Sequence, residues 1–258
     1  MREIDSGLLL GLLARELRTR LSNVTTGWFW LIVTPLLLLA VYGLVFGVIF
    51  RARVPADLEV PFVAWLAVAL WPWLAFSDGA LRGAQAIQQH AALIAKVSVP
   101  RWLLTASSQT AAFLLQGVGY LVVLLVLGLF GVELDIRSLP YLLLILSGLF
   151  VFSLGLALLL SALQVFLRDL EQLLPTLFML WFFLTPIIYA PEMLPEKAIV
   201  LLQLNPMTWW VGEIRAALFY DKWLPDLTFM ALFVSALLML WVGKTVFDRL
   251  SPHFEDFL

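Results

Sequence analysis

The 258-residue chain contains no cysteine, and this absence excludes thiol catalysis, disulfides and thiolate metal sites. Histidine is almost as scarce. The two histidines, His90 and His253, lie far apart in the sequence and offer no spacing that is typical of a metal site. We therefore expect no metal ion and no other cofactor bound to this chain.

Charged residues are also few. They make up 13% of the chain, against about a quarter in soluble domains, and 62% of the residues are hydrophobic. The stretch from Trp28 to Phe50 contains no ionisable side chain except Tyr42, and about 20 such residues span a bilayer. The net charge of −2 does not suggest a nucleic-acid partner. These features predict an all-α polytopic membrane protein.

Six membrane spans follow from the uncharged runs, within a single domain that covers residues 1–258. They lie near 28–50, 61–81, 102–131, 139–166, 173–190 and 227–247. An even number of spans places both termini on one side of the membrane. That side holds ten of the sixteen Lys and Arg residues, including Arg15, Arg18 and Arg20 before the first span, so we expect both termini to be cytoplasmic.

The N-terminal segment 6–22 has the periodicity of an amphipathic helix, and it predicts an interface helix on the inner leaflet. Its leucines share one face: Leu10, Leu13, Leu17 and Leu21. Glu16 can pair with Arg20 one helical turn away.

Two polar segments fall on the cytoplasmic side. In segment 82–101 we expect a short amphipathic helix that Pro100 ends, and Arg82 can pair with Asp78 just before it. This segment is either a docking element or an ordinary loop. Between the fourth and fifth spans, Arg168, Asp169 and Glu171 form either a solvated turn or a contact that transmits force from a cytoplasmic partner.

Within the outer segment 191–226, the stretch 198–219 is apolar, but Asn205-Pro206, Glu213 and Arg215 interrupt it. We expect short helices here, at the outer interface or re-entrant, and not a seventh span.

The sequence "WVGKTVF" contains Gly-Lys-Thr but is not a phosphate-binding loop, because that motif requires glycine where Leu238 stands. Ion-coupled transport normally places ionisable residues within the spans, and these spans are nearly free of charge. No spacing among the outer carboxylates indicates a catalytic pair. If this protein moves a substrate, we expect the energy to come from another chain.

Eleven tryptophans include the pairs Trp28/Trp30, Trp71/Trp73 and Trp209/Trp210. Tryptophan gathers at membrane interfaces. Its flat apolar face and polar edge also suit a sugar ring, so some of these side chains are candidates for a transport pathway. Trp71 and Trp73, on either side of Pro72 within the second span, remain open to both interpretations.

The order of these features resembles the membrane subunit of ABC exporters for lipid-linked polysaccharides, those that export O-antigen, teichoic acid or capsule. The resemblance covers nearly the whole chain and rests on "LARELRTRL", "WFWLIVTPLLLLAVYGLVFGVIF", "AALIAKVSVPRWLL", "FLRDLEQLLPTLFMLWFFLTPIIY" and "LNPMTWWVGEIRAALF". It implies a subunit of the bacterial inner membrane that is not itself an enzyme. Two copies would form the pathway, above two copies of a separate ATPase that binds ATP and Mg²⁺.

The resemblance also implies roles for individual residues. The coupling helix on the ATPase, with a second inner contact, would comprise Gln88, Gln89, His90, Leu93, Ile94, Lys96, Arg101, Arg168 and Asp169. The interface helix would carry Arg15, Arg18 and Arg20 toward lipid head groups. The pathway aromatics would be Trp28, Trp30, Tyr42, Phe46, Trp181, Phe182 and Tyr189. The outer gate helices, 195–219, would contain Trp209, Trp210, Glu213 and Arg215.

Two other functions stay open at this point. An ABC exporter for a drug or a simple lipid would use the same fold. A stand-alone membrane enzyme acting on lipid-linked sugars would turn over without ATP, and would depend on Glu213 or Asp221.

Overall fold

The computed structural model describes residues 6–22, 27–50, 54–55, 58–94 and 99–257. About 84% of the chain is helical, and the described residues contain no strand. Among them, five helical stretches are long and apolar enough to cross a membrane: Phe29–Ile49, Phe62–Gln89, Arg101–Leu129, Ile136–Phe166 and Leu227–Phe254. The prediction of a polytopic all-α membrane protein is therefore confirmed.

The long helices in chain order are α2 (Gly27–Tyr42, continued as a π-helix over Gly43–Ile49), α3 (Phe62–Gln89), α5 (Arg101–Leu129), α6 (Leu139–Phe166) and α10 (Leu227–Leu250). The shorter ones are α1 (Ser6–Ser22), α4 (Ala91–Ile94), α7 (Leu170–Phe183), α8 (Glu196–Gln203) and α9 (Pro206–Phe219). Short 3-10 turns cover Ile136–Ser138, Pro191–Met193 and Ser251–Asp256.

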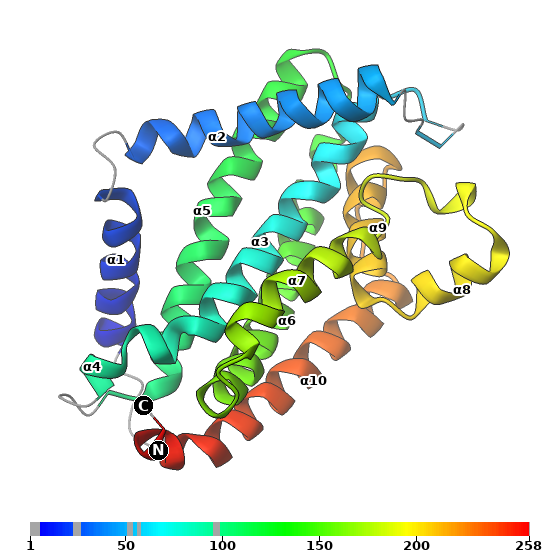
Figure 1. Cartoon of the computed structure of the whole chain (residues 1–258). Coiled ribbons are helices and arrows are strands. Elements are labelled where there is room, and N and C mark those ends of the chain that lie inside the picture. The colour runs from blue at the N-terminus through cyan, green and yellow to red at the C-terminus, as the bar shows by residue number, and fades with distance from the viewer. Residues whose placement is uncertain (1–5, 23–26, 51–53, 56–57, 95–98, 258) are drawn as a thin grey trace.

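Helix α3 is the centre of the bundle. In its most apolar stretch 83% of the residues are buried, whereas in that of α2 only 17% are buried. Figure 1 shows α3 in cyan, with α5 on one side and α6 and α7 on the other, and α1 and α2 on the outside. Alanine and glycine are frequent along α3, and small side chains let neighbouring helices approach closely.

Helix α7 is shorter than the fifth span expected at 173–190. It has 14 residues, or about 21 Å at 1.5 Å per residue, whereas the hydrocarbon core is about 30 Å thick. The helix ends at Phe183 because Pro186 has no backbone N–H and disfavours the helical conformation at Thr185 before it.

Helix α3 is longer than the span expected at 61–81 and continues to Gln89. The sequence from Ala80 to Gln89 is rich in alanine and glutamine, which favour helix. The expected pair also supports it, since Arg82 Nε lies 2.6 Å from Asp78 Oδ1. In the described part of the expected amphipathic helix, only the single turn α4 follows α3.

Helices α6 and α10 are in backbone contact at two glycines. A Cβ on Gly243 would overlap the carbonyl of Gly155, and a Cβ on Gly155 would overlap the backbone at Leu240. Gly243 is the glycine of the Gly-Lys-Thr sequence, and helix packing accounts for it without any phosphate-binding role.

Candidate functional site

One end of the bundle, which we call the α4 end, gathers segments that are distant in the sequence. A cluster of apolar side chains joins the ends of α3 and α6, the start of α5 and the turn after α10. Its buried members are Ile87, Leu104, Leu158, Ala162, Val165, Phe247 and Phe254, with Leu12, Leu93, Ile94, Trp102 and Phe166 packed against them. Three segments that the sequence predicts to be cytoplasmic therefore meet here: segment 6–22, segment 82–101 and the C-terminal segment after α10.

Several residues expected to contact an ATPase have hydrogen-bond partners within this chain. Gln88 Nε2 donates to the carbonyl of Gln164 at 3.1 Å, and Gln164 Nε2 donates back to Gln88 Oε1 at 3.0 Å. Arg101 donates to the carbonyl of Ser251, and Arg168 Nη2 donates to the carbonyl of Phe257 at 3.2 Å. These side chains join helices to one another at the α4 end.

The remaining predicted coupling residues differ in position. Leu93 and Ile94 pack on the apolar cluster, while Gln89 and Asp169 are exposed. Lys96 lies outside the described residues. The exposed surface that the α4 end offers to a partner therefore includes Gln89, Arg168 and Asp169.

Helix α1 packs along α5, and one end of it lies near α4 (Figure 1). The expected pair is present, with Arg20 Nε 3.8 Å from Glu16 Oε2. Arg20 also donates to the carbonyl of Ser108 on α5 at 3.0 Å, so it points inward, whereas Arg15 and Arg18 are exposed. Sequence reasoning missed a further contact: His90 Nε2 lies 3.1 Å from Glu16 Oε1.

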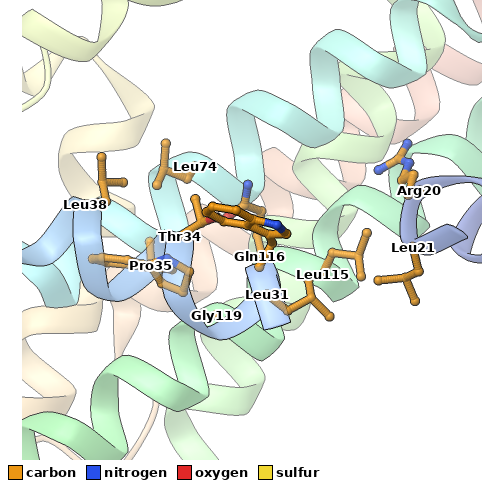
Figure 2. A pocket seen from close by; sticks show the side chains of 12 residues that line it. Arg20, Leu21, Leu31, Thr34, Pro35, Leu38, Leu74, Leu115, Gln116 and Gly119 are labelled. Carbon is orange, nitrogen blue, oxygen red and sulfur yellow. The ribbon is translucent and has the colours of Figure 1, made fainter. Parts of the chain in front are cut away.

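A pocket of about 380 Å³ lies between the end of α1, the middle of α2, and helices α3 and α5. Figure 2 shows Arg20 and Leu21 on one side of it and Leu38 and Leu74 on the other. Its walls are mostly apolar and include Trp30 and Trp71. The structure thus brings Arg20 of α1 together with two of the candidate pathway aromatics.

Gly119 shapes this pocket. A Cβ at this position would lie 3.2 Å from Trp71 Nε1 and 3.5 Å from Pro35 Cγ, so glycine allows α2 and the indole to approach α5 closely. The pocket combines a cation at one end with an apolar interior. That combination suits a lipid chain with an anionic head group.

The candidate pathway aromatics fall into two groups. Trp73 is 3% exposed and packs against Trp181 and Phe182, with ring centroids 6.0 and 5.9 Å away. This group belongs to the protein core between α3 and α7, and Trp71 is equally buried.

On α2, by contrast, Trp30 is 45% exposed, and Tyr42 stacks on Phe46 with ring centroids 5.8 Å apart. The Tyr189 hydroxyl donates to the carbonyl of Phe183 at 3.0 Å. The side chain of Trp28 lies outside the described residues.

The opposite end, which we call the α9 end, comprises residues 184–226 and the starts of α3 and α6. Glu213 is 4% exposed, and its carboxylate is fully engaged. The Tyr141 hydroxyl donates to Oε2 at 2.6 Å, and Lys222 Nζ lies 2.8 Å from both oxygens. Lys222 also pairs with Asp226 at 2.8 Å. Glu213 therefore joins α9 to α6 and to the segment before α10.

Arg215, 7% exposed, makes a different set of contacts. Its guanidinium lies 3.2 Å over the ring of Trp65, at the start of α3. It donates to the carbonyls of Pro186 at 2.7 Å and Ile187 at 3.0 Å. Arg215 therefore joins α9 to α3 and to the chain that follows α7.

These contacts explain how α7 can end early, because backbone carbonyls in an apolar environment need donors. Thr185 Oγ1 donates to the carbonyl of Trp181 at 2.8 Å, and Asn205 Nδ2 donates to that of Leu184 at 3.0 Å. Asn205 Oδ1 also accepts from the backbone N–H of Met207, which caps α9. Side chains of α9 and of the turn itself thus replace the missing helical donors.

The two tryptophans expected in the outer gate differ. Trp210 is fully buried, whereas Trp209 is 41% exposed and donates from Nε1 to the carbonyl of Gln203 at 2.8 Å. Of the residues expected in the outer gate, Trp210, Glu213 and Arg215 are therefore buried in the protein.

The family of this fold is evident from the sequence. The profile of the ABC-2 type transporter family matches residues 8–219, from α1 to the last residue of α9. The chain belongs to this family. An O-antigen export system permease protein, RfbA of Myxococcus xanthus, is 32% identical over 254 residues, covering 97% of this chain and 95% of the relative.

Other ABC-2 relatives are more distant but equally complete. RfbA of Klebsiella pneumoniae is 27% identical over 255 residues, covering 97% of this chain and 95% of its own length. The polysialic acid transport protein KpsM of Escherichia coli is 24% identical over 247 residues, covering 95% of this chain and 94% of its own length. The resemblance stated from the sequence is confirmed at the level of the family.

In this ABC-2 chain, the contacts of Glu213 argue against the role of catalytic base that a stand-alone enzyme would require of it. A general base must reach its substrate's proton, but both oxygens of Glu213 already bind protein groups. Among the described residues, no three His, Asp or Glu side chains lie close enough to bind one metal ion.

Proposed function

We propose that this chain is the membrane subunit of an ATP-driven exporter for a lipid-linked polysaccharide of the O-antigen, teichoic acid or capsule type. It works as a homodimer with two copies of an ABC-type ATPase in the bacterial inner membrane. The observation that carries the proposal is the likeness to polysaccharide export permeases over 95–97% of this chain.

The α4 end faces the cytoplasm in this proposal, and so do both termini. Support comes from the positive charges before α2 and at this end, among them Arg15, Arg18 and Arg168, because cytoplasmic segments of membrane proteins are enriched in Lys and Arg.

The ATPase binds the α4 end, where Gln89, Arg168 and Asp169 are exposed. Closure of the ATPase pair on ATP pushes this end. Gln88, His90, Arg101 and Arg168 connect it to α6, α1 and the segment after α10, so the push reaches several helices together. The two membrane subunits then rearrange about the dimer axis.

The lipid part of the substrate reaches the pocket between α1 and α5 from the inner leaflet. Apolar walls suit its hydrocarbon chain, and Arg20 suits its phosphate. The glycan passes between the two subunits along the exposed aromatic side chains of α2, where flat rings can stack on sugars.

Copurification with the cognate ABC-type ATPase tests the proposal. We expect a stoichiometric complex whose ATPase activity rises with lipid-linked glycan. Asp169→Lys should weaken the complex by about tenfold, because it reverses a charge at the docking surface. The matched control is Glu196→Lys, an exposed charge reversal at the α9 end, which should bind the ATPase normally.

Other outcomes would change the assignment. Stimulation by small amphiphiles and not by glycolipids would favour an exporter of drugs or simple lipids. Turnover of lipid-linked sugars by the purified chain without ATP would overturn the proposal in favour of an enzyme.

A further inference from the structure

His90 occupies a position where both ring nitrogens face oxygen atoms. Nδ1 lies 2.9 Å from the carbonyl oxygen of Ala86, and Nε2 lies 3.1 Å from Oε1 of Glu16. A carbonyl oxygen can only accept a hydrogen bond, and so can an ionised carboxylate. Both nitrogens must therefore carry a hydrogen, and the ring that fits this geometry is the charged imidazolium.

The neighbouring charges favour this state. Arg20 reaches the other oxygen of the same carboxylate at 3.8 Å, which stabilises Glu16 in its ionised form. The hydrogen bond from His90, followed by the charges of His90 and Arg20, lowers the pKa of Glu16 despite partial burial. The hydrogen bond to Glu16 raises the pKa of His90, against partial burial and the charge of Arg15.

This contact connects two parts of the chain. Glu16 belongs to α1, and His90 is the residue that ends α3 before α4. Both side chains are largely shielded from solvent, with exposed fractions of 16% and 13%. A second link from α1 to the bundle is the hydrogen bond from Arg20 to the carbonyl of Ser108, which does not titrate near neutral pH.

We propose that protonated His90 ties α1 to the α4 end, and that α1 loosens from this end as the pH rises. The sign follows from linkage. A group whose pKa is higher in the docked state stabilises docking fully below its ordinary value of 6.5, and this contribution is lost as the pH rises through the docked value.

The consequence for transport rests on the proposed function. If the ATPase pushes the α4 end, then α1 moves with it only while His90 is protonated. Coupling between ATP hydrolysis and export should therefore weaken on the alkaline side. His90 acts here as a positioning residue for α1 and not as a contact to the ATPase.

Distances between spin labels test the contact without any transport assay. The chain has no cysteine, so Gly11→Cys on α1 and Gln89→Cys at the end of α3, both exposed, give one labelled pair. In proteoliposomes we expect one short distance near pH 6 and a broad, longer distribution at alkaline pH. The ratio of docked to released α1 should fall by about tenfold for each pH unit between the released and docked pKa values of His90.

Variants at position 90 distinguish the effect of protonation from an effect on folding. His90→Gln cannot be protonated and should abolish the pH step, whereas His90→Lys stays charged and should keep α1 docked at alkaline pH. Asp248→Asn is the matched control, because it removes a carboxylate that pairs within α10, with Lys244, and should leave the pH step unchanged.

A pH-independent distance in the parent chain, or a pH step that survives in His90→Gln, would overturn the proposal. ATPase stimulation is then measured with the unlabelled parent chain in separate liposomes and tests the coupling, because Gln89 lies on the proposed docking surface. A pH step in the distance with unaltered stimulation supports the contact and refutes its role in coupling. Failure to bind any ATPase would refute the proposed function, and the distances would still decide this inference.

Discussion

The two ends of the molecule are joined by different chemistry. At the α9 end, Glu213 and Arg215 are almost fully buried, and each contacts groups from two other segments. At the α4 end, Glu16, His90 and Arg168 are nearer to solvent and each link depends on one or two hydrogen bonds.

A fully buried charge with several partners is costly to separate from them, whereas a link that is nearer to solvent and has fewer hydrogen bonds costs less to break. The comparison indicates that the α9 end is the rigid part of this fold and the α4 end the adjustable part. This difference is consistent with a protein that is driven at one end and must keep its shape at the other.

The largest effect is expected from Arg215→Ala. The substitution removes the donors to the carbonyls of Pro186 and Ile187, and among the described residues it leaves both buried carbonyls without a donor. Each unpaired group costs about 1–3 kcal/mol, so roughly 2–6 kcal/mol of stability should be lost. Thermal unfolding in detergent measures it. Arg137→Ala, at an exposed arginine of the same end, should change stability by no more than about 0.5 kcal/mol.

Arg215→Lys should recover only part of this loss, because one ammonium group cannot stack on Trp65 and reach both carbonyls as a guanidinium does. An unfolding temperature for Arg215→Ala equal to that of the parent would contradict the assignment of the α9 end as rigid.

A smaller effect is expected from Glu213→Gln. The amide keeps the shape of the carboxylate but removes its charge opposite Lys222, which retains Asp226 as a partner. The loss should be about 1–3 kcal/mol, measured by the same unfolding assay. Glu196→Gln, at an exposed position of the same end, serves as the control. A loss equal to that of the control would mean that Glu213 does not join α9 to α6.

The two ends should also respond to pH in opposite directions. The pKa of Asp226 is lowered by its hydrogen bond from Lys222 and by the backbone N–H of Phe229, so its contribution is lost as the pH falls. The pKa of His90 is raised, so its contribution is lost as the pH rises.

Hydrogen exchange, corrected for the intrinsic rate at each pH, should show protection of residues 6–22 falling first on the alkaline side. Protection of residues 206–219 should fall only in acid. Parallel loss at both ends would contradict the comparison.

The smallest effect is expected from Asp78→Asn. The Asp78–Arg82 pair lies one turn apart on α3, and its side chains are 29% and 50% exposed. Such pairs contribute about 0.3–0.5 kcal/mol. Thermal unfolding in detergent measures the loss. A loss of stability much larger than about 0.5 kcal/mol would show that the pair has a role beyond α3.

Much of this fold is predictable from the sequence because uncharged runs and local spacing determine it. The long helices coincide with the runs, and Glu16–Arg20 and Asp78–Arg82 form as one-turn spacing predicts. Pro186 is a sequence signal for the early end of α7. The predicted span nevertheless continues to residue 190, because the residues after Pro186 are apolar.

The contacts between distant segments were not predictable. Nothing local indicates that His90 faces Glu16, or that Tyr141 and Lys222 meet at Glu213. The described residues expected to contact an ATPase lie at one end, and several of them bind their own chain, because charge and amphipathicity do not specify which partner a side chain finds.

The close contact between Gly155 and Gly243 has a consequence for biosynthesis. Helix α10 is synthesised after α6 and the whole of α7, α8 and α9, so the surface of α6 around Gly155 faces lipid while these segments enter the membrane. The bundle closes only when α10 arrives. A nascent chain that stops before Gly243 therefore leaves the surface of α6 around Gly155 without its partner helix.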